Sequence, residues 1–309
     1  MTPPTAPYHA DVAVDVPGAR PAWIDAADGV RLRAITWPEG ERGTVLLFQG
    51  RTEYVEKYSD AARQLGLRGY ATAAIDWRGQ GLSPRSSRDP RLGHVRDFSE
   101  FQDDVDALLL HCDALGMPRP WHLLAHSMGG LIGLRALHRR PDFARAVFSA
   151  PMWGLPLAPH RRLLGWIASA AASGIGLGER MAPGAAKVAD PAAAPFEGNL
   201  LTTDPDMFAW MKRQITEHPE LALGGPSLGW VWAALREMHR MAREPAPAVP
   251  CLTLLGTDED IVSPDAIHVR MGSWATGTLE MVEGARHEVL TEGPGIRERL
   301  YDRIAAHLG

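Results

Sequence analysis

The sequence predicts an α/β fold in which a mostly parallel sheet is covered by helices on both faces. Short apolar runs typical of buried strands alternate with amphipathic helical patterns along much of the chain. In addition, the apolar run 121–124 leads through Ser127 and two glycines into a helical pattern that Pro141 ends. Buried strands that alternate with helices are characteristic of parallel sheets with both faces covered.

The elements before residue 150 follow this pattern in order. Asp28 and Gly29 mark a hairpin between strand-like runs at 22–25 and 30–37, which predicts two antiparallel strands at the start. The amphipathic pattern near residue 100 begins with Ser99 and Gln102, spaced as a capping box. The other strands are expected at 44–48, 70–75, 121–124 and 144–149, and the helices at 55–69 and 98–115 and after Ser127.

The pattern changes at about Trp153. Residues 153–243 contain tryptophan-rich helical segments at 161–172, 204–218 and 228–241, and no convincing buried strand. We interpret 153–243 as a helical cap inserted into a core formed by 1–152 and 244–309, with ordinary extra core helices as the alternative. The core resumes with strands at 251–255 and 278–282 and with helices at 263–271 and 293–308.

Composition excludes several classes of function. The chain has 309 residues and a net charge of −5 without long runs of one sign, so nucleic acid is not an expected partner. Cys112 and Cys251 lie in apolar contexts, which favours core thiols over a disulfide or a metal site. We expect no metal and no cofactor. The oligomeric state is not indicated.

Two segments bear on location. Residues 1–17 lack a basic region followed by an apolar region, so they do not resemble a secretory signal. The weakly apolar stretch 163–177 is shorter than a membrane-spanning helix requires. We therefore expect a cytoplasmic protein, with peripheral contact with the inner face of the membrane left open.

The most informative stretch surrounds Ser127. A strand, a sharp turn carrying a serine and a following helix make up a nucleophile elbow, whose usual pattern is G-x-S-x-G. Small residues two positions before and after the serine let the turn close and expose the hydroxyl. Here these positions hold Ala125 and Gly129, so the first glycine is replaced by another small residue.

A serine hydroxyl needs a base, and the base needs an acid that orients it. His287 follows the last predicted strand and is the candidate base. The loop after the preceding strand supplies three adjacent acids, Asp258, Glu259 and Asp260. An oxyanion hole is also required, because it usually makes the largest contribution to acyl transfer. The backbone N–H groups of Met128 and Arg51 are the candidates, and Gly50 lets the second loop turn toward substrate.

These residues resemble the α/β-hydrolase superfamily, and within it the branch of monoacylglycerol lipases and bacterial lysophospholipases. The chain departs from the branch pattern at Gln49, where His is frequent, and at Gln80, where G-H-G is common. The family position of the acid corresponds to Glu259, with Asp258 and then Asp260 as alternatives. The resemblance is carried by residues 49–54, 76–83, 125–130, 256–262 and 284–288.

The resemblance implies a serine hydrolase that cleaves a carboxylic ester through an acyl-enzyme, with a monoacylglycerol or a lysophospholipid as substrate. Alternatives of the same fold are a small-ester carboxylesterase and a proline iminopeptidase-like enzyme. The latter would need cap carboxylates, for which Glu217 and Glu220 are available. A ligand-binding pseudo-hydrolase without turnover is the alternative outside enzymes.

Overall fold

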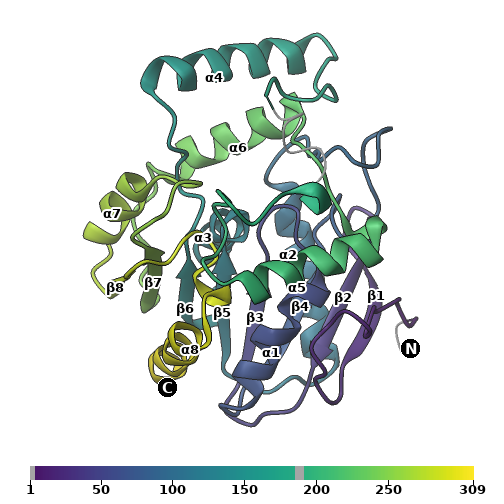
Figure 1. Cartoon of the computed structure of the whole chain (residues 1–309), viewed down its shortest axis with the longest axis vertical. Helices are drawn as coiled ribbons and strands as arrows, with labels where there is room; N and C mark the ends of the chain where they lie inside the picture. Colours follow the sequence, from purple (N-terminus) through teal and green to yellow (C-terminus); the bar gives the residue numbers. More distant parts are fainter. Residues whose placement is uncertain (1–3, 185–190) are drawn as a thin grey trace.

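The computed structural model describes residues 4–184 and 191–309, and its centre is one eight-stranded sheet with the order β1-β2-β4-β3-β5-β6-β7-β8 (Figure 1). Strand β2 is antiparallel to both of its neighbours, and every pairing from β4 to β8 is parallel. This confirms the predicted mostly parallel sheet. The strands are β1 (Arg20–Asp25), β2 (Arg31–Trp37), β3 (Thr44–Phe48), β4 (Ala71–Ile75), β5 (Trp121–His126), β6 (Phe143–Ser149), β7 (Cys251–Gly256) and β8 (Gly277–Val282).

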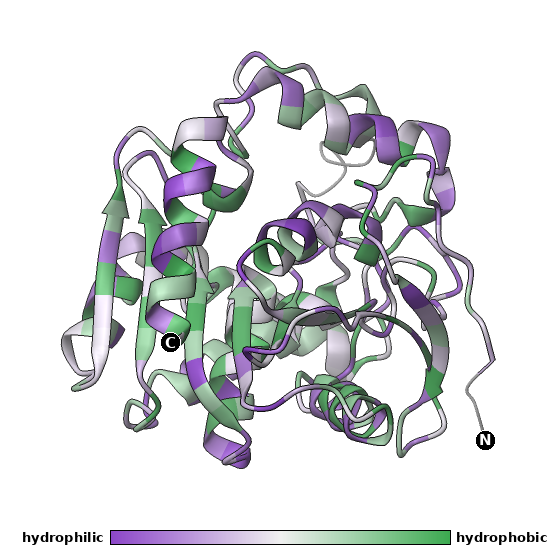
Figure 2. Ribbon diagram, turned by 90° about the horizontal axis from the view of Figure 1, so that it is seen from below, coloured by the Kyte–Doolittle hydropathy of each residue, from purple (hydrophilic) through white to green (hydrophobic). Residues whose placement is uncertain are grey.

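Helices cover both faces of the sheet, as the sequence predicts. On β3, Val45 and Leu47 join one buried apolar cluster and Leu46 and Phe48 join the other, because successive strand side chains point to opposite faces. Inner strands are accordingly mostly green in Figure 2, whereas the surrounding helices carry both colours. One cluster includes residues of α1 (Ser59–Gly66) and α8 (Pro294–Leu308); the other includes residues of α2 (Glu100–Ala114), α3 (Met128–Arg139) and α7 (Pro264–Gly272).

Local sequence signals explain the first elements, with one correction. The predicted hairpin forms between β1 and β2, and Gly29 supplies its positive φ of 84°. The predicted capping box at α2 is wrong, because the Ser99 side chain caps no helical N–H. Its hydroxyl donates instead to Asp97, while Gln102 is buried and donates to the Ile132 carbonyl of α3. A tertiary contact thus replaces the local one.

The segment between β6 and β7 contributes no strand to the sheet within the described part of the chain. Its helix α4 packs on α6, and α6 packs on α3, the helix that directly follows Ser127. Figure 1 shows α4 as the outermost element, beyond α6. The helices of this segment are α4 (Pro159–Gly174), α5 (Pro205–Glu217) and α6 (Leu228–Met241), with short 3₁₀ turns η3 (Pro191–Ala193) and η4 (Pro219–Leu221). Two further turns, η1 (Val55–Tyr58) and η5 (Val289–Thr291), precede α1 and α8.

Two other expectations concern the thiols and the membrane. Cys112 and Cys251 are buried and unpaired, which confirms that they are core thiols. Across the described ranges, no helix has both the length and the hydropathy needed to cross a bilayer.

Candidate active site

Ser127 stands at a strained turn between β5 and α3. Its φ of 49° and ψ of −118° are rare for a residue other than glycine. Gly129 must be glycine, because a Cβ there would lie 2.1 Å from the Phe48 carbonyl oxygen. The replacement of the first elbow glycine by Ala125 is accommodated by Gly133, whose missing side chain leaves room for that methyl group. The turn therefore projects the serine side chain away from the packed interior.

The structure brings together three of the residues singled out in the sequence. His287 Nε2 lies 3.0 Å from Ser127 Oγ, and His287 Nδ1 lies 2.8 Å from Glu259 Oε2. The other carboxylate oxygen of Glu259 accepts hydrogen bonds from the backbone N–H groups of Ile261 and Val262, at 2.6 and 2.9 Å. Serine, imidazole and a fixed carboxylate thus form one continuous hydrogen-bonded chain, the arrangement that activates a serine hydroxyl.

The carboxylate in this chain belongs to Glu259 and not to either neighbouring aspartate. Asp258 and Asp260 are exposed, whereas Glu259 is buried. Burial by itself raises the pKa of the Glu259 carboxyl, but the bond from His287 and two backbone N–H groups bring that pKa below its ordinary value. Glu259 is therefore ionised at neutral pH, as an orienting acid must be.

The two predicted oxyanion donors come from different segments of the chain. The N–H of Met128 opens α3, where the helix dipole adds positive potential, and that of Arg51 lies in the loop after β3. Neither N–H donates to an acceptor within residues 4–184 and 191–309. Gln80 holds the second loop from behind: it accepts from Thr52 N–H and donates to the Gly50 carbonyl. This departure from the family pattern thus has a structural function.

A buried charged network that the sequence analysis missed lies behind these loops. Lys57 Nζ is 2.5 Å from both Glu53 Oε1 and Glu288 Oε1. Glu53 also accepts from the Gly50 N–H and from the Tyr58 hydroxyl. Because Glu288 directly follows His287, Lys57 links the loop after β3 to the loop that carries His287. The four-residue spacing of Glu53 and Lys57 was the sequence signal that could have predicted their ion pair.

Ser127 and His287 open into a cavity of about 1000 Å³. The segment between β6 and β7 supplies most of its apolar wall and is tied to the histidine loop, since the Leu200 carbonyl accepts from the His287 N–H. Glu217 and Glu220, the carboxylates considered for an aminopeptidase, do not line the cavity. The apolar residues supplied by the segment include Leu155, Leu200, Leu201, Phe208, Met211, Ile215, Leu223 and Trp230.

The Arg51 side chain is a cation in this wall without a counter-ion. One guanidinium nitrogen donates to the Gly224 carbonyl at 2.6 Å, and the group lies over the Trp230 ring at 5.2 Å. Its Nε is buried without a hydrogen-bond partner in the part of the chain that the structure describes, and no ion pair to it is formed there. Burial lowers the pKa of Arg51 to about 10, so the charge persists at neutral pH.

Comparisons with known proteins agree with this geometry. Residues 39–294 match the family described as serine aminopeptidase, S33. A probable lysophospholipase L2 of Haemophilus influenzae is 31% identical over 88% of this chain and 86% of its own length. Lysophospholipase L2 of Escherichia coli K12 is 32% identical over 82% and 76%.

Solved structures show the same fold. Monoglyceride lipase of Saccharomyces cerevisiae, in complex with a substrate analogue, aligns with a TM-score of 0.74 at 21% identity over 98% of each chain. A monoacylglycerol lipase of Paleococcus ferrophilus aligns with a TM-score of 0.70 at 25% identity, over 90% of this chain and 98% of its own. The resemblance seen in the sequence is confirmed: the chain is a hydrolase of the serine aminopeptidase S33 family, within the α/β-hydrolase superfamily.

Proposed function

We propose that the protein is a lysophospholipase that cleaves its ester through an acyl-enzyme. Ser127 attacks the ester carbonyl while His287 Nε2 takes the hydroxyl proton. Glu259 keeps the imidazole proton on Nδ1 and stabilises the imidazolium. His287 then protonates the departing alcohol and later deprotonates the water that releases the fatty acid. The 3.0 and 2.8 Å contacts of His287 support these roles.

In this proposal the backbone N–H groups of Met128 and Arg51 stabilise the negative charge of the tetrahedral intermediate by hydrogen bonds. Both groups lack an acceptor within the described ranges, so each can donate to the oxyanion without breaking an existing bond. The sequence of steps needs neither a metal nor an organic cofactor, because every proton transfer is carried by His287.

The acyl chain fits the apolar part of the cavity. In this proposal residues 153–243 act as a cap over the core, since residues of this segment such as Phe208 and Trp230 line the wall beside Ser127. An acyl chain that leaves water for this wall gains about 0.8 kcal/mol for each buried methylene group. This gain favours a lipid ester over an acetyl ester.

The observation that carries the choice of substrate is the unpaired cation of Arg51. A charged guanidinium in an apolar wall is stabilised by an anion, and guanidinium groups bind phosphate oxygens well. The head group of a lysophospholipid provides a phosphodiester close to its ester, whereas monoacylglycerol has a neutral glycerol. The names of the lysophospholipase relatives agree with this assignment.

Replacement of Arg51 by glutamine tests whether this side chain recognises the phosphate of a lysophospholipid. We expect kcat/KM for a lysophospholipid to fall about 10- to 100-fold, since hydrogen bonds to charged groups contribute roughly 1.5–3 kcal/mol. Monoacylglycerol with the same acyl chain should change by less than about 3-fold, because the backbone N–H of residue 51 is retained. Arg91→Gln, at an exposed arginine, is the matched control. An equal loss of kcat/KM for both lipids in the variant would contradict phosphate recognition by Arg51. A folded wild-type protein that cleaves neither lipid would contradict lipid hydrolysis itself.

We also propose that α4 contacts lipid surfaces. Leu163, Leu164 and Ile167 on this outermost helix are 60%, 65% and 56% exposed, an apolar face without a protein partner in the described structure. Replacement of all three by serine should reduce co-sedimentation with phosphatidylcholine–phosphatidylglycerol vesicles several-fold. Leu110→Ser, at an equally exposed leucine on α2, should not. Unchanged co-sedimentation of the triple variant would exclude α4 as the contact.

A further inference from the structure

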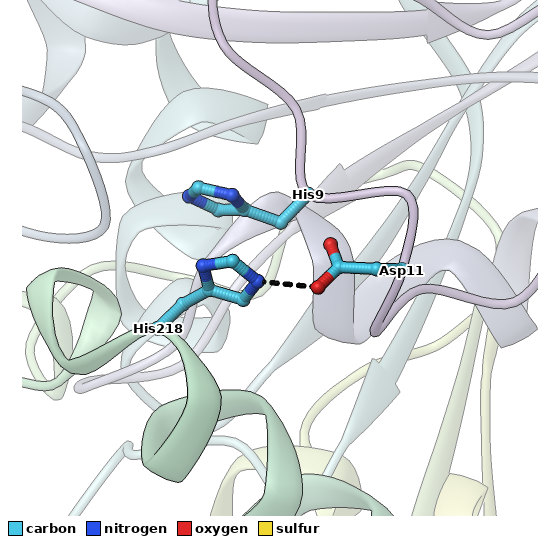
Figure 3. A group of neighbouring side chains, drawn as sticks. All are labelled: His9, Asp11 and His218. Carbon is cyan, nitrogen blue, oxygen red and sulfur yellow. Dashed lines mark hydrogen bonds and ion pairs between the residues drawn. The ribbon is translucent and has the colours of Figure 1, made fainter.

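A second group of ligand-type side chains lies away from Ser127, where the N-terminal arm (residues 4–19, before β1) meets the end of α5. His9 and Asp11 come from the arm, and His218 caps α5 (Figure 3). The imidazoles of His9 and His218 stack with centroids 3.7 Å apart and planes 21° from parallel. His218 Nε2 lies 2.8 Å from Asp11 Oδ2. Two chain segments about 200 residues apart thus present two imidazoles and one carboxylate at one point.

The spacing of these donor atoms is close to that of a metal site. One ligand atom from each of His9, Asp11 and His218 lies within 4.8 Å of the others. Ligands bound about 2.0–2.2 Å from one ion are separated from each other by roughly 3–4 Å. Binding would require the two rings to rotate out of their stacked arrangement, because an imidazole nitrogen ligates a metal in the plane of its ring.

A second observation is the unsatisfied nitrogen of His9. Its Nε2 is buried and makes no hydrogen bond in the described structure, although Glu220 Oε1 lies 3.2 Å away. A buried polar atom without a partner costs free energy. The same Glu220 oxygen lies 3.5 Å from His218 Nδ1, so a further carboxylate stands beside both rings.

We propose that His9, Asp11 and His218 form a binding site for a divalent transition-metal ion of the Zn²⁺ class. Two imidazoles with carboxylates are a donor set that suits Zn²⁺, Ni²⁺ and Cu²⁺. A divalent ion would neutralise Asp11, the carboxylate that faces His218 Nε2.

The other cluster of comparable composition differs because it already contains a cation. Glu53, His126 and Glu288 also place their ligand atoms within 4.8 Å of one another. However, the ammonium group of Lys57 already lies 2.5 Å from both of these carboxylates and supplies the positive charge. Metal binding is therefore assigned to the surface site at His9 and not to the buried cluster.

Bound metal would link the N-terminal arm to the wall of the cavity. The Val12 carbonyl of the arm accepts from Trp210 Nε1 and Gln214 Nε2 on α5, each at 3.1 Å. The same helix contributes Phe208 and Met211 to the cavity. An ion that joins His9 and Asp11 to His218 therefore stabilises the packing of the arm on α5. Its first effect is on stability, which is independent of the reaction at Ser127.

Calorimetric titration of the chelator-treated protein with ZnCl₂, combined with thermal unfolding, tests the site. We expect one binding event that is lost in His218→Ala and in Asp11→Asn. Zinc at about 100 times its dissociation constant should raise the Tm of the wild type by roughly 3–6 °C and leave that of either variant unchanged. Exposed His268 supplies the control variant His268→Ala, which should bind like the wild type.

Two results would overturn the proposal. One is the absence of zinc binding to the wild type at millimolar concentration, which would leave the group as a hydrogen-bonded contact between arm and helix. The other is binding that persists in both variants, which would place the ion elsewhere. Visible absorption of Co²⁺ adds a readout that does not depend on stability, because imidazole ligation gives d–d bands that Asp11→Asn and His218→Ala should alter.

Discussion

We expect replacement of Ser127 by alanine to lower kcat for a lipid ester at least about 10⁴-fold. Without the hydroxyl no acyl-enzyme forms, and the remaining catalysis comes from the oxyanion hole and substrate binding alone. The backbone should be unaffected, because alanine meets the same cost as serine at a φ of 49°. KM should stay within a few-fold of the wild-type value, since the cavity wall is unchanged. Steady-state assays with a lysophospholipid and with p-nitrophenyl esters measure the effect.

A fluorophosphonate probe makes this test independent of the choice of substrate. The wild type should be labelled at Ser127 because His287 Nε2 lies 3.0 Å from its hydroxyl. Ser127→Ala should not be labelled, while Ser273→Ala, at an exposed serine, should react like the wild type. A folded wild-type protein that resists the probe would favour a binding protein without turnover. A preference for acetyl over long acyl esters would favour a small-ester carboxylesterase.

Sequence patterns were sufficient to predict the parts of the fold that depend on residues close together in the chain. Short apolar runs predict the strands because the residues of a buried strand are themselves apolar. The elbow around Ser127 has a local sequence pattern, although Gly129 is required by the close approach of Phe48 on the neighbouring strand β3. The order of strand ends then places His287 near Ser127, because parallel strands end at one edge of the sheet. The structure brings those two residues together as this order implies.

Contacts between segments far apart in the chain leave no comparable pattern in the sequence. Lys57 and Glu288 are 231 positions apart, and nothing in either sequence context indicates their ion pair. The bond between Asp11 and His218 spans 207 positions in the same way. Even at short range, a tertiary contact can replace the local pattern: Gln102 donates to α3 instead of completing a capping box. Such contacts depend on how whole elements pack, which composition and periodicity do not specify.

The second large effect on kcat is expected from replacement of Glu259, one of the three adjacent acids at 258–260. We expect Glu259→Gln to lower kcat about 10³- to 10⁴-fold, with little change in KM. Ile261 and Val262 donate two N–H groups to one oxygen of residue 259. The glutamine oxygen would occupy that position and its NH₂ group would face His287 Nδ1. The imidazole would then carry its proton on Nε2, where it can no longer accept the proton of Ser127.

Asp258→Asn and Asp260→Asn remove the same charge one position away and are the matched controls. Both side chains are exposed and neither bonds to His287, so kcat should stay within about 3-fold of wild type. If charge near the site were what mattered, all three variants would lose similar activity, because exposed charges at this separation differ little in long-range potential. If orientation of His287 is what matters, the loss is confined to Glu259→Gln, and the far-UV spectrum and Tm of all three proteins remain comparable. A larger loss in Asp258→Asn than in Glu259→Gln would mean that the imidazole pairs with a different carboxylate during turnover.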